Sequence, residues 1–385
     1  MYLGLDLGTS SVKVIVIDDD GLTVAQSSCS LSISHPHPLW SEQNPDDWLK
    51  AAEKSISGIP KQIRENIQGI GLSGQMHGAV LIDKKNRPLR PAILWNDGRS
   101  FKECHEMEKN NPQLRSITGN QIMPGFTAPK MAWLEKHEPQ IFSLIHKILL
   151  PKDYLRLIWS GRYATDTSDA SGTLWLDIEK RVWSEAAINT SKLSLEQLPE
   201  IFEGHEITGL ISQATAQKLG IPIVPIIAGA GDQAAGAIGS SVINPNDASL
   251  ALGTSGVIFI VTDGFLPNPL QGTHAFCHSI PSTWHQMAVT LSAASAVDWC
   301  ANLTGYVTPS DAYDDAEKKG SSEKVMFLPY LSGERTPHNN AYLRGSFHNL
   351  NTASNIDEIL YSVVEGVCFG IKDGYEAVHS VSPIS

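Results

Sequence analysis

One aspartate in this sequence stands where acid–base chemistry would need a carboxylate. Residues 222–228 are apolar, rich in Ile and Val, and predict a strand, which is followed by Gly229-Ala230-Gly231 and then Asp232. Small residues continue beyond Asp232 and predict a helix. A carboxylate between a strand and a helix N-terminus is accessible, and the helix dipole favours its anionic form. We therefore expect Asp232 to be a general base; a plain N-cap aspartate, which is common at such positions, is the alternative.

A stretch that could hold phosphate oxygens occurs twice. Residues 5–18 match residues 250–263 at nine positions. Each copy carries the same turn between two apolar segments, Gly8-Thr9-Ser10 in the first and Gly253-Thr254-Ser255 in the second. Such a turn offers unhindered backbone N–H groups and two hydroxyls, which suit phosphate. A pair of ordinary hairpins is the alternative, and the duplication favours phosphate turns.

Two other predicted strands end in polar residues. Residues 67–72 lead into Gln75-Met76-His77 after Ser73 and Gly74, and residues 91–94 lead into Trp95-Asn96-Asp97. Both ends could line one pocket for a small polar ligand. For His77 taken alone, a satisfied structural histidine is the alternative.

The spacing of the repeat defines the elements that must position these residues. It is too long for a solenoid period and indicates two homologous domains, 1–243 and 244–385, each opening with strand, turn and strand. Residues 100–162 are mostly helical in pattern, and residues 161–177 predict a loop or short strands. Residues 357–378 predict a long helix whose Gly366, Gly370 and Gly374 suggest close packing against another backbone.

Composition restricts the class of protein. The 385 residues are 42% hydrophobic and 18% charged, as in ordinary globular enzymes. The net charge is −12 with no cluster of Lys and Arg, which disfavours DNA or RNA as a partner. An acidic protein that binds a polyphosphate must use backbone amides, a few placed cations and a divalent metal. Five scattered cysteines without a Cys-x-x-Cys pair indicate reduced thiols in a cytoplasmic protein, and the absence of a signal region or long apolar run disfavours secretion and a membrane.

Taken together, these motifs resemble those of the FGGY carbohydrate kinases, and within that family those of the xylulokinases, over essentially the whole chain. The segments that carry the resemblance are 4–10, 74–78, 95–99, 124–130 with Trp133, 231–232, 252–256 and 328–340. The resemblance implies an α/β fold of two actin-like, ribonuclease-H-like ATPase domains with a ligand cleft between them. It implies ATP-dependent phosphorylation of D-xylulose to D-xylulose 5-phosphate with Mg²⁺, and it makes a homodimer an expectation.

The resemblance also implies roles for individual residues. Asp232 would take the proton of the sugar hydroxyl, and Asp6 would assist in binding magnesium and phosphate. The residues expected at the metal are Asp6 and Asp232, partly through water. Those expected at the sugar are Gln75, Met76, His77, Trp95, Asn96, Asp97, Asp232 and Gln233. Those expected at ATP and its phosphates are Gly8, Thr9, Ser10, Lys13, Gly253, Thr254 and Ser255.

Three departures from the family pattern bear on these expectations. Gln233 stands where xylulokinases usually have asparagine, a change that could shift sugar preference, and Asn349 stands where glycine is usual. The family also normally continues past this point into a glycine-rich loop that contacts adenosine, so a C-terminally truncated second domain is expected. A sugar-binding protein with little ATP turnover, and a kinase for a related ketose such as ribulose, are therefore alternatives.

Overall fold

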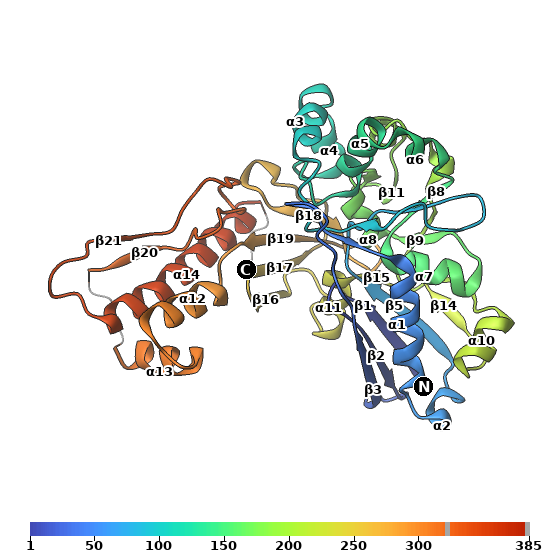
Figure 1. Cartoon of the computed structure of the whole chain (residues 1–385), viewed down its shortest axis with the longest axis horizontal. Coiled ribbons are helices and arrows are strands. Elements are labelled where there is room, and N and C mark those ends of the chain that lie inside the picture. The colour runs from blue at the N-terminus through green and yellow to red at the C-terminus, as the bar shows by residue number, and fades with distance from the viewer. Residues whose placement is uncertain (320–323, 382–385) are drawn as a thin grey trace. The chain divides into compact units, whose positions relative to one another are not determined.

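The structure is a computed structural model that describes residues 1–319 and 324–381 (Figure 1). It contains two compact units, whose division falls between Ser241 and Val242. The N-terminal unit comprises Met1–Thr118, Ile122–Ser241 and Phe276–Thr283, and the C-terminal unit comprises Gly119–Gln121, Val242–Ala275 and the described residues from Trp284 onward. The two short exchanged segments are a feature that the sequence pattern does not indicate.

In the described structure, a seven-stranded sheet forms the centre of the N-terminal unit. Its strand order is β13-β14-β5-β1-β2-β3, with β15 pairing to β5. The strands are β1 (Tyr2–Leu7), β2 (Ser11–Ile17), β3 (Thr23–Ser30), β5 (Gly69–Gly74), β13 (Ile207–Leu210), β14 (Pro225–Ile227) and β15 (Ala230–Gly231). β1 runs antiparallel to β2 and parallel to β5, so the expected opening strand, turn and strand are confirmed and β1 lies inside the sheet.

The core of this unit lies on one face of the sheet because apolar residues alternate along its strands. Leu3, Leu5 and Leu7 of β1 are almost fully buried and share a cluster with residues of α1 (Pro45–Ser57), α7 (Pro151–Ser160) and α10 (Gln213–Leu219). Figure 1 shows α1 beside these strands. Burial of each such leucine stabilises the fold by about 1.5–3 kcal/mol. The opposite face of the sheet carries the polar and glycine residues of the same strands, among them Asp6.

The start of α1 follows from local sequence. The Asn44 side chain accepts a hydrogen bond from the Asp46 backbone N–H at 3.1 Å, and Pro45 occupies the first helical position. Acidic Asp46 and Asp47 fill the first turn, where the helix dipole favours negative charge. A sequence that both caps and orients the helix therefore presents Trp48 to the core.

The remaining elements of the N-terminal unit support the loops around the sheet. They are β4 (Glu42–Gln43), α2 (Lys61–Arg64), β6 (Val80–Ile82), β7 (Ala92–Ile93), α3 (Phe101–Asn110), α4 (Leu114–Thr118), α5 (Thr127–His137), α6 (Pro139–Leu144), β8 (Lys147–Leu149), β9 (Ala164–Asp166), α8 (Thr167–Ala170), the 3-10 turns Ser171–Thr173 and Leu195–Gln197, β10 (Leu176–Asp177), β11 (Val182–Trp183), α9 (Glu185–Asn189), β12 (Glu200–Phe202) and α11 (Asp232–Gly239). The mostly helical pattern of residues 100–162 is confirmed, apart from β8.

The expectation of a loop or short strands over residues 161–177 is confirmed only for the short strands β9 and β10. Residues 164–176 are all buried and form β9, α8, a 3-10 turn and the start of β10. The polar composition that suggested a loop instead serves internal hydrogen bonds and ion pairs. A buried polar segment has the same composition as an exposed one, and only its partners distinguish the two.

The C-terminal unit repeats the opening hairpin. β16 (Ala248–Leu252) and β17 (Gly256–Thr262) are antiparallel, as β1 and β2 are, so the duplicated strand-turn-strand is confirmed. The described elements that follow are the 3-10 turn Pro269–Gln271, β18 (His274–Cys277), β19 (Trp284–Thr290), α12 (Ala294–Thr304), α13 (Pro309–Lys319), β20 (Met326–Leu328), β21 (Ser346–His348) and α14 (Ile356–His379). None of the described helices is long and apolar enough to cross a membrane.

The glycines of α14 allow the close packing that their spacing suggests. A Cβ on Gly366 would lie 2.3 Å from the Phe327 carbonyl oxygen, and one on Gly374 would lie 3.2 Å from the Ala288 Cβ. The helix begins with a capping box between Asn355 and Glu358. The expected contact between helix and backbone is therefore confirmed.

Candidate functional site

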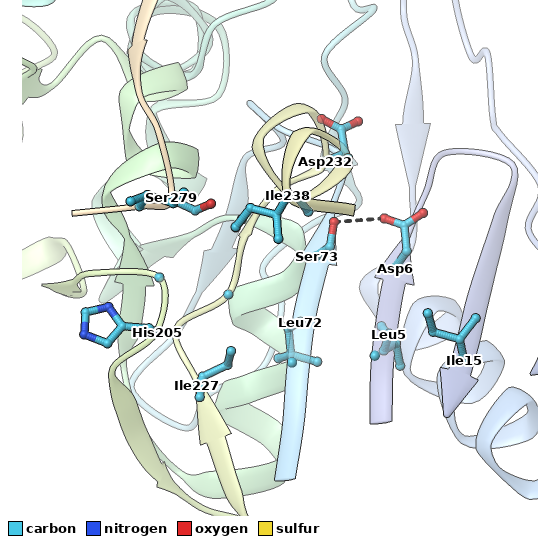
Figure 2. A pocket seen from close by; sticks show the side chains of 18 of the residues that line it. Leu5, Asp6, Ile15, Leu72, Ser73, His205, Ile227, Asp232, Ile238 and Ser279 are labelled. Carbon is cyan, nitrogen blue, oxygen red and sulfur yellow. Dashed lines mark hydrogen bonds between the residues drawn. The ribbon is translucent and has the colours of Figure 1, made fainter. Parts of the chain in front are cut away.

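A cavity of about 630 Å³ opens on the face of the N-terminal sheet that does not carry the core. Its walls come from β1, β2, β5 and β14, from α11, and from the segments around His205 and Ser279. Most of the lining is apolar or glycine backbone. Asp6, Ser73 and Asp232 bring polar groups to it, as Figure 2 shows. The cavity therefore carries two carboxylates in a lining that is otherwise mainly apolar.

Strand register explains why three polar residues meet here. Asp6 on β1 lies opposite Lys13 on antiparallel β2 and opposite Ser73 on parallel β5. Register partners on neighbouring strands project to the same face of a sheet. The Ser73 hydroxyl donates a hydrogen bond to Asp6 Oδ1 at 3.2 Å (Figure 2), and Lys13 is exposed beside them. Of the expected site residues, Asp6, Lys13 and Asp232 line this one cavity.

Asp232 is the first residue of α11. The N-cap is Gly231, so the Asp232 side chain does not cap this helix. Its Oδ1 accepts from the Gln233 backbone N–H at 2.8 Å, and its residue is partly accessible to solvent. Burial, and next the negative charge of Asp6, raise the pKa of Asp232 to about 6. Burial and the like charge of Asp6 thus act against the hydrogen bond from Gln233, and a pKa of about 6 still leaves the group anionic at neutral pH.

The first phosphate turn is tied to residues expected at the sugar. The Gly8 N–H donates to the Ser11 carbonyl at 3.0 Å, which closes the turn. The Thr9 hydroxyl donates to Gln75 Oε1 at 3.0 Å and accepts from Trp95 Nε1 at 3.0 Å. Ser10, at the tip of the turn, is exposed. The turn after β1 and the ends of two other predicted strands are thus brought together, although Thr9, Gln75 and Trp95 do not line the cavity.

Gln43 is a buried residue of this network that the sequence analysis missed. Its Nε2 donates to the Thr9 carbonyl at 2.7 Å, and its Oε1 accepts from Gln75 Nε2 at 3.0 Å and from Trp48 Nε1 at 2.9 Å. One amide thereby connects the phosphate turn, the end of β5 and α1. No local signal distinguishes Gln43 from a surface glutamine, because all of these partners are distant or generic in sequence.

The chain after β5 is held in an unusual conformation. His77 has φ of 66°, in the left-handed region, and its carbonyl accepts from Thr127 Oγ1 at 3.1 Å and from Lys130 Nζ at 2.8 Å. His77 Nδ1 pairs with the Gly172 carbonyl at 2.7 Å. Met76 is buried beside it. These contacts fix the backbone that the sequence predicts to contact a sugar.

The segment after β7 divides into an exposed and a buried part. Trp95 and Asn96 are exposed, whereas Asp97 is buried. Both carboxylate oxygens of Asp97 accept from the Arg99 guanidinium, at 2.9 and 2.7 Å, and Oδ2 also accepts from the Ser41 N–H at 2.6 Å. Asp97 therefore braces the loop that presents Trp95 and Asn96. Gln233, the last of the expected sugar residues, is exposed on α11.

The second turn lies at the start of α12 in the C-terminal unit. The Gly253 N–H donates to the Ser255 carbonyl at 3.0 Å, and the Gly253 carbonyl accepts from Ala294 at 2.9 Å. The Thr254 carbonyl accepts from the Ser295 hydroxyl at 2.6 Å. This turn is closed one residue earlier than its N-terminal copy, where the Gly8 N–H donates to the Ser11 carbonyl, and it contacts the N-terminus of α12.

The cavity's carboxylates suit a magnesium ion accompanied by phosphate. Mg²⁺ in such sites is held by one or two carboxylates, with water and phosphate oxygens completing its six ligands. Asp6 and Asp232 lie close enough for their charges to repel, as the raised pKa of Asp232 indicates, and a divalent cation would relieve that repulsion. In the part of the chain that the structure describes, no three His, Cys, Asp or Glu residues form a closed metal cluster. Two carboxylates would leave most of the six positions around such an ion to water and phosphate oxygens.

Comparison with known proteins covers nearly the whole chain. Residues 1–239 match the N-terminal domain of the FGGY family of carbohydrate kinases, and residues 248–385 match its C-terminal domain. The xylulose kinase of Escherichia coli K12 is 49% identical over 382 residues, which are 99% of this chain and 79% of that protein. The xylulose kinase of Klebsiella pneumoniae is 46% identical over 99% of this chain and 79% of that protein.

Solved structures agree with the sequence matches. A xylulose kinase from Brucella ovis superposes with a TM-score of 0.95 at 45% identity, covering all of this chain and 80% of that one. A Plasmodium falciparum glycerol kinase with ADP has a TM-score of 0.90 at 24% identity, covering 100% of this chain and 80% of that one, and shows that the fold is shared beyond close relatives. The fold is the two-domain, actin-like ATPase fold of mixed α/β content.

Proposed function

The chain belongs to the FGGY family of carbohydrate kinases and is a phosphotransferase, and we propose that it transfers the γ-phosphoryl group of ATP to D-xylulose, giving ADP and D-xylulose 5-phosphate. One observation of the structure carries the proposal: Asp232 and Asp6 line one cavity beside Lys13. Phosphoryl transfer requires an oriented hydroxyl and neutralised charge rather than a covalent nucleophile, and these residues supply both.

Asp232 acts as the general base. Its Oδ1 is engaged by the Gln233 N–H, so Oδ2 is the atom that we assign to accept the proton of the attacking sugar hydroxyl. The sugar oxygen then forms its bond to the γ-phosphorus as the bond from that phosphorus to the bridging oxygen of ADP breaks. A pKa of about 6 leaves the carboxylate ionised at neutral pH yet basic enough to take a proton.

Mg²⁺ is the proposed cofactor, held by Asp6 and Asp232, partly through water. When bound, it supplies charge neutralisation for the phosphate oxygens. Lys13 adds a positive charge beside Asp6. The turn residues Gly8, Thr9 and Ser10, with Gly253, Thr254 and Ser255 in the C-terminal unit, are proposed to bind the phosphates of ATP through N–H groups and hydroxyls.

The sugar contacts are proposed from the network around Thr9. Gln75, Met76 and His77 would present backbone and side-chain groups to the hydroxyls of the sugar, and Gln233 an amide. Trp95 and Asn96 are exposed and would close over it, and Asp97 would hold their loop through its pairing with Arg99. Five unpaired cysteines in the described residues fit a reducing compartment, and we propose the cytoplasm.

The test is ADP release with Mg²⁺ and ATP in the presence of D-xylulose, D-ribulose or glycerol. D-Xylulose should give the highest kcat/KM, and Asp232→Asn should lower kcat by about 10²-fold or more. Asp20→Asn, which changes an exposed turn carboxylate, is the matched control and should keep wild-type turnover. Higher kcat/KM with D-ribulose would replace the proposed sugar, and full turnover by Asp232→Asn would remove the proposed base.

A further inference from the structure

The turn that carries Asp232, residues 228–231, is held at its backbone polar groups by contacts from distant segments. The Ala228 N–H donates to the Glu206 carbonyl at 2.8 Å, and the Gly229 N–H donates to the Gly204 carbonyl at 2.8 Å. Ala230 and Gly231 form β15, which pairs with β5, and side chains supply further bonds to the turn. Buried backbone N–H and C=O groups need hydrogen-bond partners, and two side chains, Arg156 and Ser168, supply several of them here.

Arg156 of α7 supplies two of the bonds. Its Nη1 donates to the Ile227 carbonyl at 2.7 Å, and its Nη2 donates to the Ala228 carbonyl at 2.6 Å. The same Nη2 lies 3.2 Å from Asp153 Oδ1, and the side chain is fully buried. The planar guanidinium thus clamps two consecutive carbonyls at the end of β14, a geometry that a lysine ammonium does not reproduce.

Ser168 of α8 supplies the next bond. Its Oγ accepts from the Gly231 N–H at 3.1 Å and donates to Asp166 Oδ2. Because the Ser168 hydroxyl donates its hydrogen bond to the Asp166 carboxylate, a lone pair of the hydroxyl oxygen can accept the bond from the Gly231 N–H. Asp166 in turn caps α8 by accepting from the backbone N–H groups of Ser168 and Asp169 at 2.9 and 3.1 Å.

Behind these two side chains lies a buried charge cluster. Lys152 Nζ is 2.7 Å from Asp153, 2.8 Å from Asp166 and 3.1 Å from Asp169, and all four side chains are inaccessible to solvent. Transfer of such groups out of water costs several kcal/mol per ion, and apolar replacements of buried ion pairs are often as stable. Stability therefore does not explain the cluster, whereas its orientation of Arg156 and of the Ser168 hydroxyl does.

Burial and neighbouring charges shift the pKa values of two groups in the cluster. Burial, the largest influence, raises the pKa of Asp169 well above its usual value, and the charges of Asp153 and Asp166 add to this. Burial alone would lower the pKa of Lys152, but the three carboxylates raise it above its usual value.

We propose that Arg156 and Ser168 are positioning residues for Asp232: the buried cluster around Lys152 fixes them, and they fix the turn that sets where the Asp232 carboxylate stands. The inference rests on the proposed function for Asp232 as the base. Misplacement of a reacting group by about 1 Å can cost up to about 10²-fold in rate, so bonds to the turn carry a catalytic consequence although neither side chain reaches the substrate.

The test compares three variants in the 385-residue chain. Ser168→Ala removes the acceptor for the Gly231 amide, and Ser168→Thr restores a hydroxyl. Thr173→Val is the matched control, because its buried hydroxyl also donates one bond, to Ala170, and accepts one backbone amide, that of Trp175. Ser168→Ala should lower kcat about tenfold or more with a sugar KM within about threefold of wild type, and Ser168→Thr should recover most of kcat. Thr173→Val should keep wild-type kcat.

A fourth variant, at Arg156, and a measurement without substrate test the inference separately from effects on folding and on substrate binding. Arg156→Lys retains the positive charge of the cluster but loses the guanidinium that donates to two carbonyls at once, and it should lower kcat as Ser168→Ala does. Without substrate, amide hydrogen exchange of residues 230–233 should be faster than in the wild type in Ser168→Ala and Arg156→Lys, and unchanged in Thr173→Val. Folded variants with unchanged kcat and unchanged exchange would overturn the inference. If the wild type shows no sugar-dependent turnover, the proposed function fails, and exchange alone decides whether the turn is held as inferred.

Discussion

At the scale of residues, Asp232 shows how a site sets its own acidity. Its carboxylate should be ionised for proton transfer, and its pKa is about 6 because of burial and of Asp6. We therefore expect kcat/KM for D-xylulose to rise about tenfold per pH unit below pH 6 and to level off above it. Initial rates between pH 4.5 and 8 measure this. A flat profile across that range would contradict the assignment of Asp232 as the base.

The same shift makes Asp232 costly for stability. The folded-state pKa of about 6 lies above the ordinary value of 3.8, so between these values the folded state holds a proton that the unfolded chain releases. The free energy of unfolding therefore falls as pH rises from 3.8 through about 6, where the folded chain loses this proton. Below pH 3.8 the group is protonated in both states and has no such effect. Asp232→Asn should raise stability by about 1–3 kcal/mol at pH 7.5 and by little at pH 3.5. Denaturant unfolding at the two pH values measures both, and equal effects would contradict the cause given.

Lys130 is a buried lysine that holds the backbone at His77. Its Nζ donates to the carbonyls of His77 and Gly125, each at 2.8 Å, and burial lowers its pKa to about 7. Lys130→Met keeps the volume but leaves two buried carbonyls without this donor, at about 1–3 kcal/mol each. We expect loss of stability and a sugar KM raised several-fold. Lys136→Met, on the exposed face of the same helix, should cost less than about 1 kcal/mol and leave KM unchanged. Equal KM values for the two variants would contradict the role given to Lys130.

At the scale of elements, the turn between β14 and α11 depends on a glycine. Gly229 has φ of +76°, and a Cβ there would lie 1.9 Å from the Leu72 carbonyl oxygen. Gly229→Ala should therefore destabilise the fold by about 3 kcal/mol or more, since the obstacle is the backbone of β5. Gly239→Ala at the end of α11 meets no atom within 4 Å and should be neutral or stabilising by up to about 1 kcal/mol. Thermal unfolding measures the melting temperatures of both variants. Similar melting temperatures would show that the backbone of β5 moves aside to accommodate the added Cβ.

Secondary structure was predicted best where its causes are local. The repeated hairpin and the long helix near the end of the sequence both rest on residues that are near one another in sequence. The segment 161–177 was predicted only in part, because its polar residues are satisfied by partners in α7 and by the turn before Asp232. Polar composition alone cannot tell such a buried segment from a loop.

At the scale of the whole molecule, sugar binding should be visible as stability. Most residues proposed at the sugar lie in the N-terminal unit, around Thr9, Gln75 and Asp232. D-Xylulose at a hundred times its Kd should stabilise the folded chain by about 2.7 kcal/mol. A concentration-dependent rise in Tm measures this, with D-glucose as the control sugar. No shift with D-xylulose at concentrations that saturate turnover would contradict the proposed site. A homodimer stays a prediction, which light scattering checks.

The sequence by itself determined the family, the two-part repeat, the strand that delivers Asp232 and the pairing of Asp6 with a Gly-Thr-Ser turn. These depend on residue type and short spacing, which a sequence displays directly. Only the tertiary structure decided that Gln43 joins Thr9 to Gln75, that Ser168 holds the turn before Asp232, and that burial and Asp6 raise the pKa of Asp232. Each of these depends on groups brought together from tens or hundreds of residues apart, 63 between Ser168 and Gly231, and on the burial that follows. Distance and solvent exclusion set such interactions, and neither is written in local sequence.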